Sequence, residues 1–474
     1  MKIATALRRQ VKLQVECSMR KCTSNELGLR IHKQVTILIL MALTTIPLLR
    51  AEGPANPMAK SLSLSTAVDL AIKNNLGTLL AGEHVFESEG TRGILRSALL
   101  PNIAASAYQA SLTENMAAMG LPVQDLKGFP VFVGPFNRFD ARISIVQSIF
   151  DLSAIRRFRA GSKAVELAGE EKQLASQQVT TATIISYLAV LEEEQSLSAA
   201  QSNIRLAERL LALAISQKEA GVATGIDVAR AETRLANQRV QLAQAQTGLD
   251  TARLNLLRVI GLPLSIDIVL EDRMRFGTEN VLDSNQAIER ALADRAEIEM
   301  ADSQVKIAEL QQKASTAAWF PTVRAFGDYG SSGLKPNEIN LPTRSVGIQL
   351  NLPIFDGGRI RSEVKVTSSR LRQAEMQRND LHAAIAKEVR QAIVILKTRE
   401  EQVKASTQAE ALANRELELA QDRFQNGAGD NIEVIHAQTA LEDARRIYIS
   451  SLAQFNIARL DLAVAMGHPE DFRF

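Results

Sequence analysis

The chain has 474 residues, of which 23% are charged and 46% hydrophobic, and its formal net charge is +2. The positive sign comes from residues 1–51, which hold nine Lys or Arg and two acidic residues; the rest has 46 basic and 51 acidic residues, a balance that argues against a nucleic-acid partner. Both cysteines, Cys17 and Cys22, lie in the same leading segment, so residues 52–474 contain no disulfide, thiolate metal site or cysteine nucleophile.

The leading segment is predicted to be a secretory signal peptide. A run of fifteen mostly apolar residues, Val35 to Leu49, follows the basic Lys33. It is shorter than the ~20 residues that cross a bilayer. The run ends at Leu49-Arg50-Ala51, a small-residue cleavage site of imperfect form. We therefore assign 1–51 to the signal peptide, with Met19 as an alternative start and a membrane anchor as the alternative function of the segment.

The remainder of the chain is a tandem repeat of half-proteins. The segment 67–76 returns as 287–296, an offset of 220, and Ile149-Phe150-Asp151 returns as Ile354-Phe355-Asp356, an offset of 205. A unit of this size is far longer than a solenoid repeat. The sequence predicts two structural repeats, 52–280 and 281–474, related by a pseudo-two-fold.

Long proline-free stretches predict long helices. No proline lies between Pro135 and Pro263, or between Pro353 and Pro469, and both stretches are rich in strong helix formers. Each is interrupted once by a glycine-containing turn. A short helix begins each repeat, and the predicted hairpin helices are 152–219, 226–260, 357–425 and 431–466. The first helix of each hairpin is on the order of 100 Å long.

Period-two alternation of apolar and polar residues predicts strands between the helices. Val346, Ile348 and Leu350 fall on one face of such a strand, and the intervening residues are polar or glycine. The predicted strands are 101–113, 138–150, 320–331 and 343–355. Alternation of this kind fits both a membrane barrel with a wet lumen and a half-buried soluble sheet.

The distribution of aromatic residues favours the membrane barrel. Of twenty aromatic residues, eleven fall in 101–150 and 319–355. Aromatic residues at strand ends are typical of a membrane-interface girdle, although ordinary β-propensity also enriches them in strands. The predicted girdle residues are Phe139, Phe150, Trp319, Phe320 and Phe355.

Four strands cannot close a barrel, which needs about eight. If these strands cross a membrane, the protein must oligomerise, because a lipid-exposed sheet edge is not tolerated. The offset between the repeats falls inside the strand–loop–strand unit, and the extra residues lie in the longer loop 113–138. Loops absorb insertions, so this segment is the predicted outer loop.

Taken in order, these features resemble the TolC family of bacterial outer-membrane efflux proteins. The resemblance covers about 62–470 and rests on the repeat, the strand pairs ending in Ile-Phe-Asp, the turns Gly-Val-Ala-Thr-Gly-Ile-Asp-Val and Gly-Ala-Gly-Asp-Asn-Ile-Glu-Val, and the Gly-x-Pro closures at 261–263 and 467–469. It implies a mainly α fold with a small β part. Helical hairpins would form a periplasmic α-barrel, and a homotrimer would share one 12-stranded outer-membrane β-barrel.

The resemblance also implies a non-enzymatic function. The protein would be the exit duct of a tripartite efflux or type I secretion system, in contact with outer-membrane lipid. A periplasmic adaptor (membrane fusion) protein and an inner-membrane pump of RND, ABC or MFS type would open it. The rival reading is an exported coiled-coil scaffold with a small soluble sheet.

The two turns are the candidate functional sites that the resemblance implies. Expected adaptor-contact residues are Gly221, Val222, Thr224, Gly427, Ala428 and Gly429. A glycine that only caps its helix is the alternative for the first glycine of each turn. The expected entrance constriction consists of Asp227, Asp430, Glu433 and His436, with stabilisation of a helix N-terminus as the alternative for the acids.

The second turn departs from the family pattern at two positions. His436 stands where some members have an acid, and Gly429 where those members have a base, which puts an identical ion-binding gate in doubt and raises the hypothesis of a pH-sensitive entrance. The remaining histidines, His32, His84, His382 and His468, show no metal-ligand spacing. We therefore expect no metal site, no cofactor and no catalytic residues.

Overall fold

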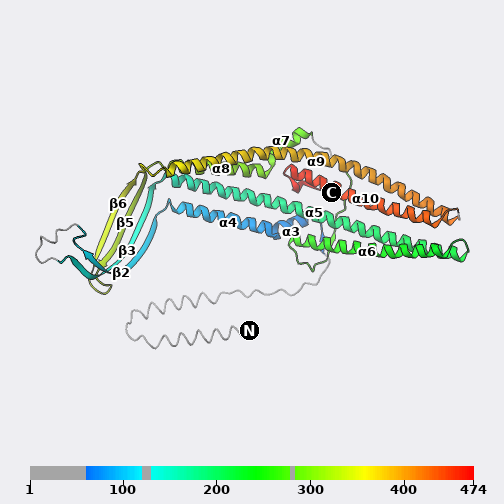
Figure 1. Cartoon of the computed structure of the whole chain (residues 1–474), viewed down its shortest axis with the longest axis horizontal. Coiled ribbons are helices and arrows are strands. Elements are labelled where there is room, and N and C mark those ends of the chain that lie inside the picture. The colour runs from blue at the N-terminus through cyan, green and yellow to red at the C-terminus, as the bar shows by residue number, and fades with distance from the viewer. Residues whose placement is uncertain (1–59, 120–129, 278–282, 427) are drawn as a thin grey trace, which may run out of the picture. The chain divides into compact units, whose positions relative to one another are not determined.

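The computed structural model describes residues 60–119, 130–277, 283–426 and 428–474, so the predicted signal peptide and Gly427 lie outside the described residues. Within these ranges the chain consists of long helices and a four-stranded antiparallel sheet (Figure 1). The predicted fold class, mainly α with four sheet strands per chain, is confirmed.

Two helical hairpins make up most of the chain. The first joins α5, Leu152–Glu219, to α6, Gly225–Ile260. The second joins α9, Arg359–Gln425, to α10, Asn431–Ala465. The 68 residues of α5 correspond to a length of about 100 Å. Because β3 precedes α5 and the first turn follows it, the sheet and the hairpin tips lie at opposite ends of this helix (Figure 1).

Part of α5 is long and apolar enough to cross a membrane by composition alone. This helix packs against α4, α6, α8 and α10, and residues such as Ile184, Tyr187 and Leu188 are buried there. Its apolar stretch is therefore accounted for by contacts with neighbouring helices.

Each hairpin is preceded by a pair of short helices that breaks at one extended residue. In the first repeat α3, Leu64–Asn74, meets α4, Leu76–Ser97, at Asn75. In the second repeat α7, Ser284–Asp294, meets α8, Ala296–Ala317, at Arg295.

The end of α6 is seated against the first of these breaks. Gly261 ends α6 with φ +75°, and a Cβ on it would lie 2.8 Å from the carbonyl oxygen of Asn74. The Asn75 side chain donates to the Val259 carbonyl at 2.8 Å. Both the positive φ and the close approach explain why glycine stands in this Gly-x-Pro closure.

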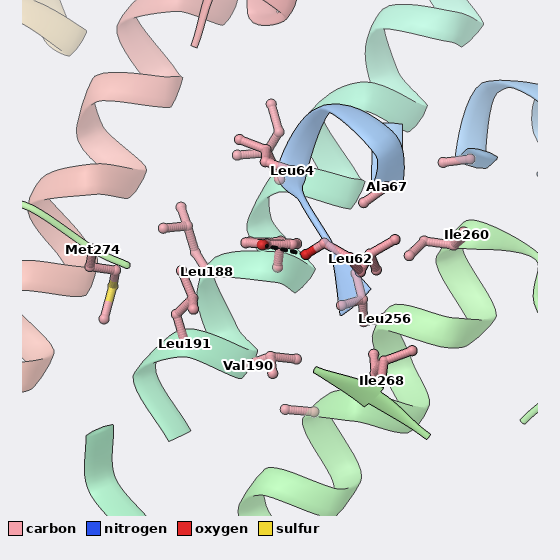
Figure 2. Close-up of a cluster of buried hydrophobic side chains, with 14 of the residues drawn as sticks. Leu62, Leu64, Ala67, Leu188, Val190, Leu191, Leu256, Ile260, Ile268 and Met274 are labelled. Carbon is pink, nitrogen blue, oxygen red and sulfur yellow. Dashed lines mark hydrogen bonds between the residues drawn. The ribbon is translucent and has the colours of Figure 1, made fainter. Parts of the chain in front are cut away.

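The main hydrophobic core lies between the two ends, where α3, α5 and α6 meet (Figure 2). Leu62, Leu188, Leu256 and Ile260 are among its fully buried residues. A pair of short parallel strands, β1 (Lys60–Leu62) and β4 (Ile268–Leu270), crosses this core and was not predicted from the sequence.

The four strands of the sheet are β2 (Asn102–Asn115), β3 (Phe132–Phe150), β5 (Thr322–Gly333) and β6 (Asn340–Asn351). They pair in the order β2-β3-β5-β6, and every pairing is antiparallel. The sheet therefore leaves β2 and β6 as unpaired edges within one chain.

Most strand bounds lie within three residues of the prediction, and two differ by more. β3 begins at Phe132 rather than at 138, because it continues to pair with β2 past a bulge between Leu112 and Glu114, so the predicted outer loop is shorter than 113–138. β6 ends at Asn351 rather than at Phe355. Pro353 has no backbone N–H for the ladder, so Ile354-Phe355-Asp356 lies in the link to α9.

The two faces of the sheet differ in charge. Between its bulges the pairing register places Ile103, Ile143, Tyr329 and Ile348 on one face, where Arg344 is the sole charged residue among the described strand positions. The opposite face carries five charged residues: Arg138, Asp140, Arg142, Arg324 and Asp328.

The polar face is held together by side-chain bonds. Arg142 forms ion pairs with Asp140 and Asp328, and Ser332 donates to Asp140 at 2.6 Å. Asp140 is only 1% exposed, so these partners compensate the burial of its charge.

Candidate functional site at the hairpin tips

The first tip, residues 220–227, is a glycine turn followed by a capped helix. Gly221 has φ +76°, a left-handed conformation that disfavours any side chain, although a Cβ there would meet no atom within 4 Å. The Val222 amide donates back to the Gln217 carbonyl at 2.9 Å. Gly221 therefore has a structural reason to be glycine, and its surface is open to contact.

Asp227 is engaged by its own helix. Its carboxylate accepts from the Thr224 hydroxyl at 2.6 Å and from the Thr224 backbone N–H at 2.9 Å, as in a capping box. Arg230 lies 3.5 Å from the second carboxylate oxygen. The pKa of Asp227 is lowered, first by the Thr224 hydroxyl, then by the Thr224 N–H and by Arg230. The geometry favours the capping alternative for this residue.

The second tip, residues 426–433, uses different capping chemistry. Asp430 caps α10 by accepting from the Ile432 N–H at 3.2 Å. The acid three residues later, Glu433, therefore has no part in the cap. Its carboxylate lies 3.5 Å from Nε of Arg423, a residue in the last turn of α9. Half of the Glu433 side chain is exposed, against 16% for Asp227.

A shallow hollow on the second tip brings most of the predicted constriction together. It is lined by Arg423, Asp430, Glu433 and His436, with Ala428, Gly429 and Ile432. Asp227 lies outside this hollow. Arg423 was missed by the sequence reasoning. It supplies a cation near Glu433 although position 429 is glycine.

Hydrogen bonds connect the two tips. The buried Asn431 side chain donates to the Asp227 backbone carbonyl at 3.1 Å, and Gln217 donates to the Phe424 carbonyl at 3.0 Å. A common apolar cluster that includes Leu210, Leu417 and Leu441 lies beneath them. The tips are thus parts of one packed unit within a chain.

A second polar link joins the hairpins farther from the tips. Glu442 of α10 forms an ion pair with Arg234 of α6 and accepts from Gln238 at 3.0 Å. Burial raises the pKa of Glu442 despite the neighbouring guanidinium. No motif marks these residues, which are separated by more than 200 positions, and only the packing of both α6 and α10 against α5 brings them together.

The predicted girdle residues lie at two levels of the sheet. Phe139 is on the loop side of β3, whereas Phe150 ends that strand next to α5. Trp319 and Phe320 lie in the turn before β5, and Phe355, 88% exposed, lies in the link after β6. Four of the five thus gather where the strands meet the helices.

The chain is similar to known outer-membrane proteins. A family model described as outer membrane efflux protein matches residues 70–262 and 274–468. The alkaline protease secretion protein AprF of Pseudomonas aeruginosa is 22% identical over 391 residues, which cover 81% of this chain and 80% of that protein. Outer membrane protein TolC of Escherichia coli is 23% identical over 346 residues, 70% of each chain.

Solved structures with the same fold include two bacterial channels. The CmeC outer membrane channel of Campylobacter jejuni superposes with a TM-score of 0.73 at 19% identity and covers 85% of both chains. The outer membrane protein VceC of Vibrio cholerae gives 0.72 at 16% identity, over 85% of this chain and 96% of that one.

Proposed function

The chain belongs to the outer membrane efflux protein family, and from this membership we propose that three copies assemble into one continuous passive duct. As a member it is a non-enzymatic outer-membrane channel of efflux and type I secretion systems, with a helical extension into the periplasm. The trimer, its partners and the roles of its tips are our proposals.

The unpaired sheet edges support the trimer. β2 and β6 run in opposite directions, so joining β6 of one copy to β2 of the next continues the antiparallel order. Three copies bring twelve strands, an even number within the range of closed outer-membrane barrels. Closure also removes the edges that a membrane cannot solvate.

The helices leave matching edges. Near the sheet the packing order is α4-α5-α8-α9, which repeats the strand order, and near the tips it is α6-α5-α10-α9. In both zones α9 is one edge, while the opposite edge changes from α4 to α6. Apolar side chains are exposed on these helices and suit burial against a second copy: Leu76, Leu80, Phe86, Val240, Val366, Met376 and Leu412.

We assign the tips to the periplasmic entrance. The exposed residues Gly221, Val222 and Thr224 of the first turn, with the exposed Ala428 and the half-buried Gly429 of the second, are the proposed contact for a periplasmic adaptor. Glu433, which does not cap its helix, is the proposed acid of the constriction. In a trimer, three copies of Glu433 would form a ring that favours cations. Asp430 and His436 line the same hollow.

An inner-membrane pump of RND, ABC or MFS type would supply energy and cargo selection through the adaptor. Names of relatives point to protease secretion in AprF and PrtF and to pyoverdine export in OpmQ. This chain is similar to all three at 20–26% identity, so the proposal extends to export in general rather than to one cargo.

A charge on the apolar face of the sheet tests the proposal. Ile348, 73% exposed in the single chain, would face lipid. Ile348→Asp costs roughly 2 kcal/mol in each protomer at that depth, and we expect loss of the trimer band on an unheated gel of the outer-membrane fraction. Gln349→Asp, on the adjacent polar face, is the matched control and should assemble.

Normal assembly of Ile348→Asp would contradict the duct. A wild-type protein found as a periplasmic monomer would support the rival, an exported coiled-coil scaffold with a soluble sheet. Ion conductance of wild-type trimers in planar bilayers provides the direct functional check.

A further inference from the structure

Arg344 occupies an unusual position on the sheet. It lies on the same face of β6 as Val346, Ile348 and Leu350. Among the described strand positions between the bulges, it is the sole charged residue of this apolar face. The residue is exposed, and no ion pair or hydrogen bond links its side chain to another described residue. A cation on a lipid-facing surface is expensive unless it reaches an anion.

Its height on the sheet places that anion near a membrane surface. Leu352, at the end next to the helices, is eight positions away, or about 27 Å along the strand. With a strand tilt of about 40°, Arg344 lies roughly 20 Å up an apolar band that is about 25 Å tall. An arginine at that height reaches the headgroup region by extending its side chain.

A hollow suited to an acyl chain lies beside it. The pairing register forms two adjacent rows across the sheet, Ala105–Ile143–Tyr329–Arg344 and Ala107–Ala141–Ser331–Pro342. All residues of these rows except Arg344, which lies next to it, line a shallow, mainly apolar surface hollow, together with Ser106, Arg142 and Gly330. Small side chains leave its floor low, the exposed Tyr329 borders it, and Arg344 ends the first row directly opposite Tyr329.

The proposed seam between copies offers Arg344 no obvious carboxylate. The β2 residues on the same face, 103 to 111 in steps of two, include no acid. Glu114, the one acid of β2, lies beyond the bulge. A cation with no partner among the described residues and a neighbouring apolar hollow together fit a lipid that carries a phosphate better than they fit a protein partner.

We propose that Arg344 binds a phosphate of an outer-leaflet lipid whose acyl chain lies in the hollow bordered by Tyr329. The site rests on the proposed function, because it requires this face of the barrel to contact the outer membrane. Three such sites would surround each trimer. Guanidinium suits the role because it donates two parallel hydrogen bonds to phosphate oxygens.

Native mass spectrometry of detergent-purified full-length trimers tests the site. The probes are lipid A with both phosphates, the same lipid A with its phosphates removed, and inorganic pyrophosphate alone. We expect wild type to retain phosphorylated lipid A, Arg344→Gln to bind it about tenfold more weakly, and Arg344→Lys to fall between them. Arg324→Gln, an exposed arginine on the polar face of β5, is the matched control and should bind as wild type does.

Several results would overturn the site. Equal retention of lipid A by Arg344→Gln, or equal binding of the dephosphorylated lipid, removes the role of the arginine. Pyrophosphate that binds as tightly as lipid A indicates a free-anion site instead. A less heat-resistant trimer with unchanged lipid binding points to an ion pair at the seam. Absence of wild-type trimers would overturn the proposed function itself, whereas intact trimers with unchanged lipid retention overturn the lipid site alone.

Discussion

The two hairpin tips carry acids at equivalent positions of the repeat, yet the acids do different work. Asp227 is held by the hydroxyl and the N–H of Thr224, and its side chain is 16% exposed. Glu433 lies next to Arg423, and its side chain is 48% exposed.

The difference arises one turn earlier, at the residue that caps each returning helix. A threonine hydroxyl can donate to the acid of the first tip, whereas the Asp430 carboxylate at the second tip cannot donate to another carboxylate. Replacing the capping residue in one copy therefore frees the following acid for a different role. The duplicated fold keeps the first tip as a capped anchor and leaves the second with an available charge.

The largest expected effect concerns the Glu442–Arg234 link, which holds the two hairpins together near their tips. Glu442→Ala leaves Arg234, 18% exposed, and the buried Gln238 without their carboxylate. We expect a loss of about 2 kcal/mol in the free energy of local opening, below the range for a fully buried pair because both side chains of the pair are partly exposed. Hydrogen exchange at amides 431–441 measures it, and α10 should lose protection at the second tip before α6 does at the first.

Glu410→Ala is the matched control. It removes the partner of Arg445 at 3.4 Å, but that pair joins α9 and α10 of one hairpin and is more exposed. Its effect should stay below about 1 kcal/mol. Equal losses in the two variants would show that the contact between hairpins has no special role.

Substitutions at both tips test whether Asp227 caps its helix while Glu433 acts on ions in the entrance. Asp227→Ala removes the capping partner and should weaken the first turn of α6 by about 1 kcal/mol, seen as roughly fivefold faster amide exchange. Glu433→Gln should leave the first turn of α10 protected but lower the cation preference of the channel in planar bilayers. Asp430→Ala, which removes the cap of α10, should reproduce in the second tip what Asp227→Ala does in the first.

The opposite pattern, with altered conductance in Asp227→Ala and faster exchange in Glu433→Gln, would reverse the assignment of the two acids. A conductance change in both variants would mean that both acids line the entrance.

The sequence determines the fold class well because its signals are local. Proline-free runs rich in alanine and leucine favour helix throughout, and alternation such as Ser345 to Leu350 permits only strand. The end of β6 was misplaced because the repeated Ile-Phe-Asp was read as part of the strand, while Pro353 already ends the ladder. The repeated Ile-Phe-Asp motif marks equivalent positions in the two repeats, but the backbone there is a strand only in the first.

The candidate site was less predictable because its chemistry depends on neighbours that the sequence does not place. Asp227 and Glu433 looked equivalent by offset, and only their hydrogen-bond partners separate them. Arg423 reaches Glu433 across a turn, and Arg234 of α6 meets Glu442 of α10 only because both helices pack against α5. Such pairings follow from tertiary structure and leave no periodic signal.

Lowering the pH should change local stability in opposite directions around Asp227 and Glu442, and these are the smallest effects that we expect. The pKa of Asp227 is lowered, chiefly by the Thr224 hydroxyl, so its stabilising effect is complete above the ordinary aspartate value of about 3.9 and is lost as pH falls through the folded value. Burial raises the pKa of Glu442, so protonation favours the folded form, and that gain appears as pH falls through its raised value toward the ordinary ~4.3.

Between pH 7 and pH 3, hydrogen exchange corrected for intrinsic rates should therefore show amides around Glu442 becoming better protected, and the first turn of α6 loosening only at the acidic end. Each change should stay below about 1 kcal/mol, the order of a single cap or a partly buried charge. Asp227→Asn should abolish the acidic loosening without altering the response around Glu442. If both regions lost protection together, global acid unfolding rather than the local bonds of Asp227 would explain the response, and the capping bonds would no longer account for the difference between the tips.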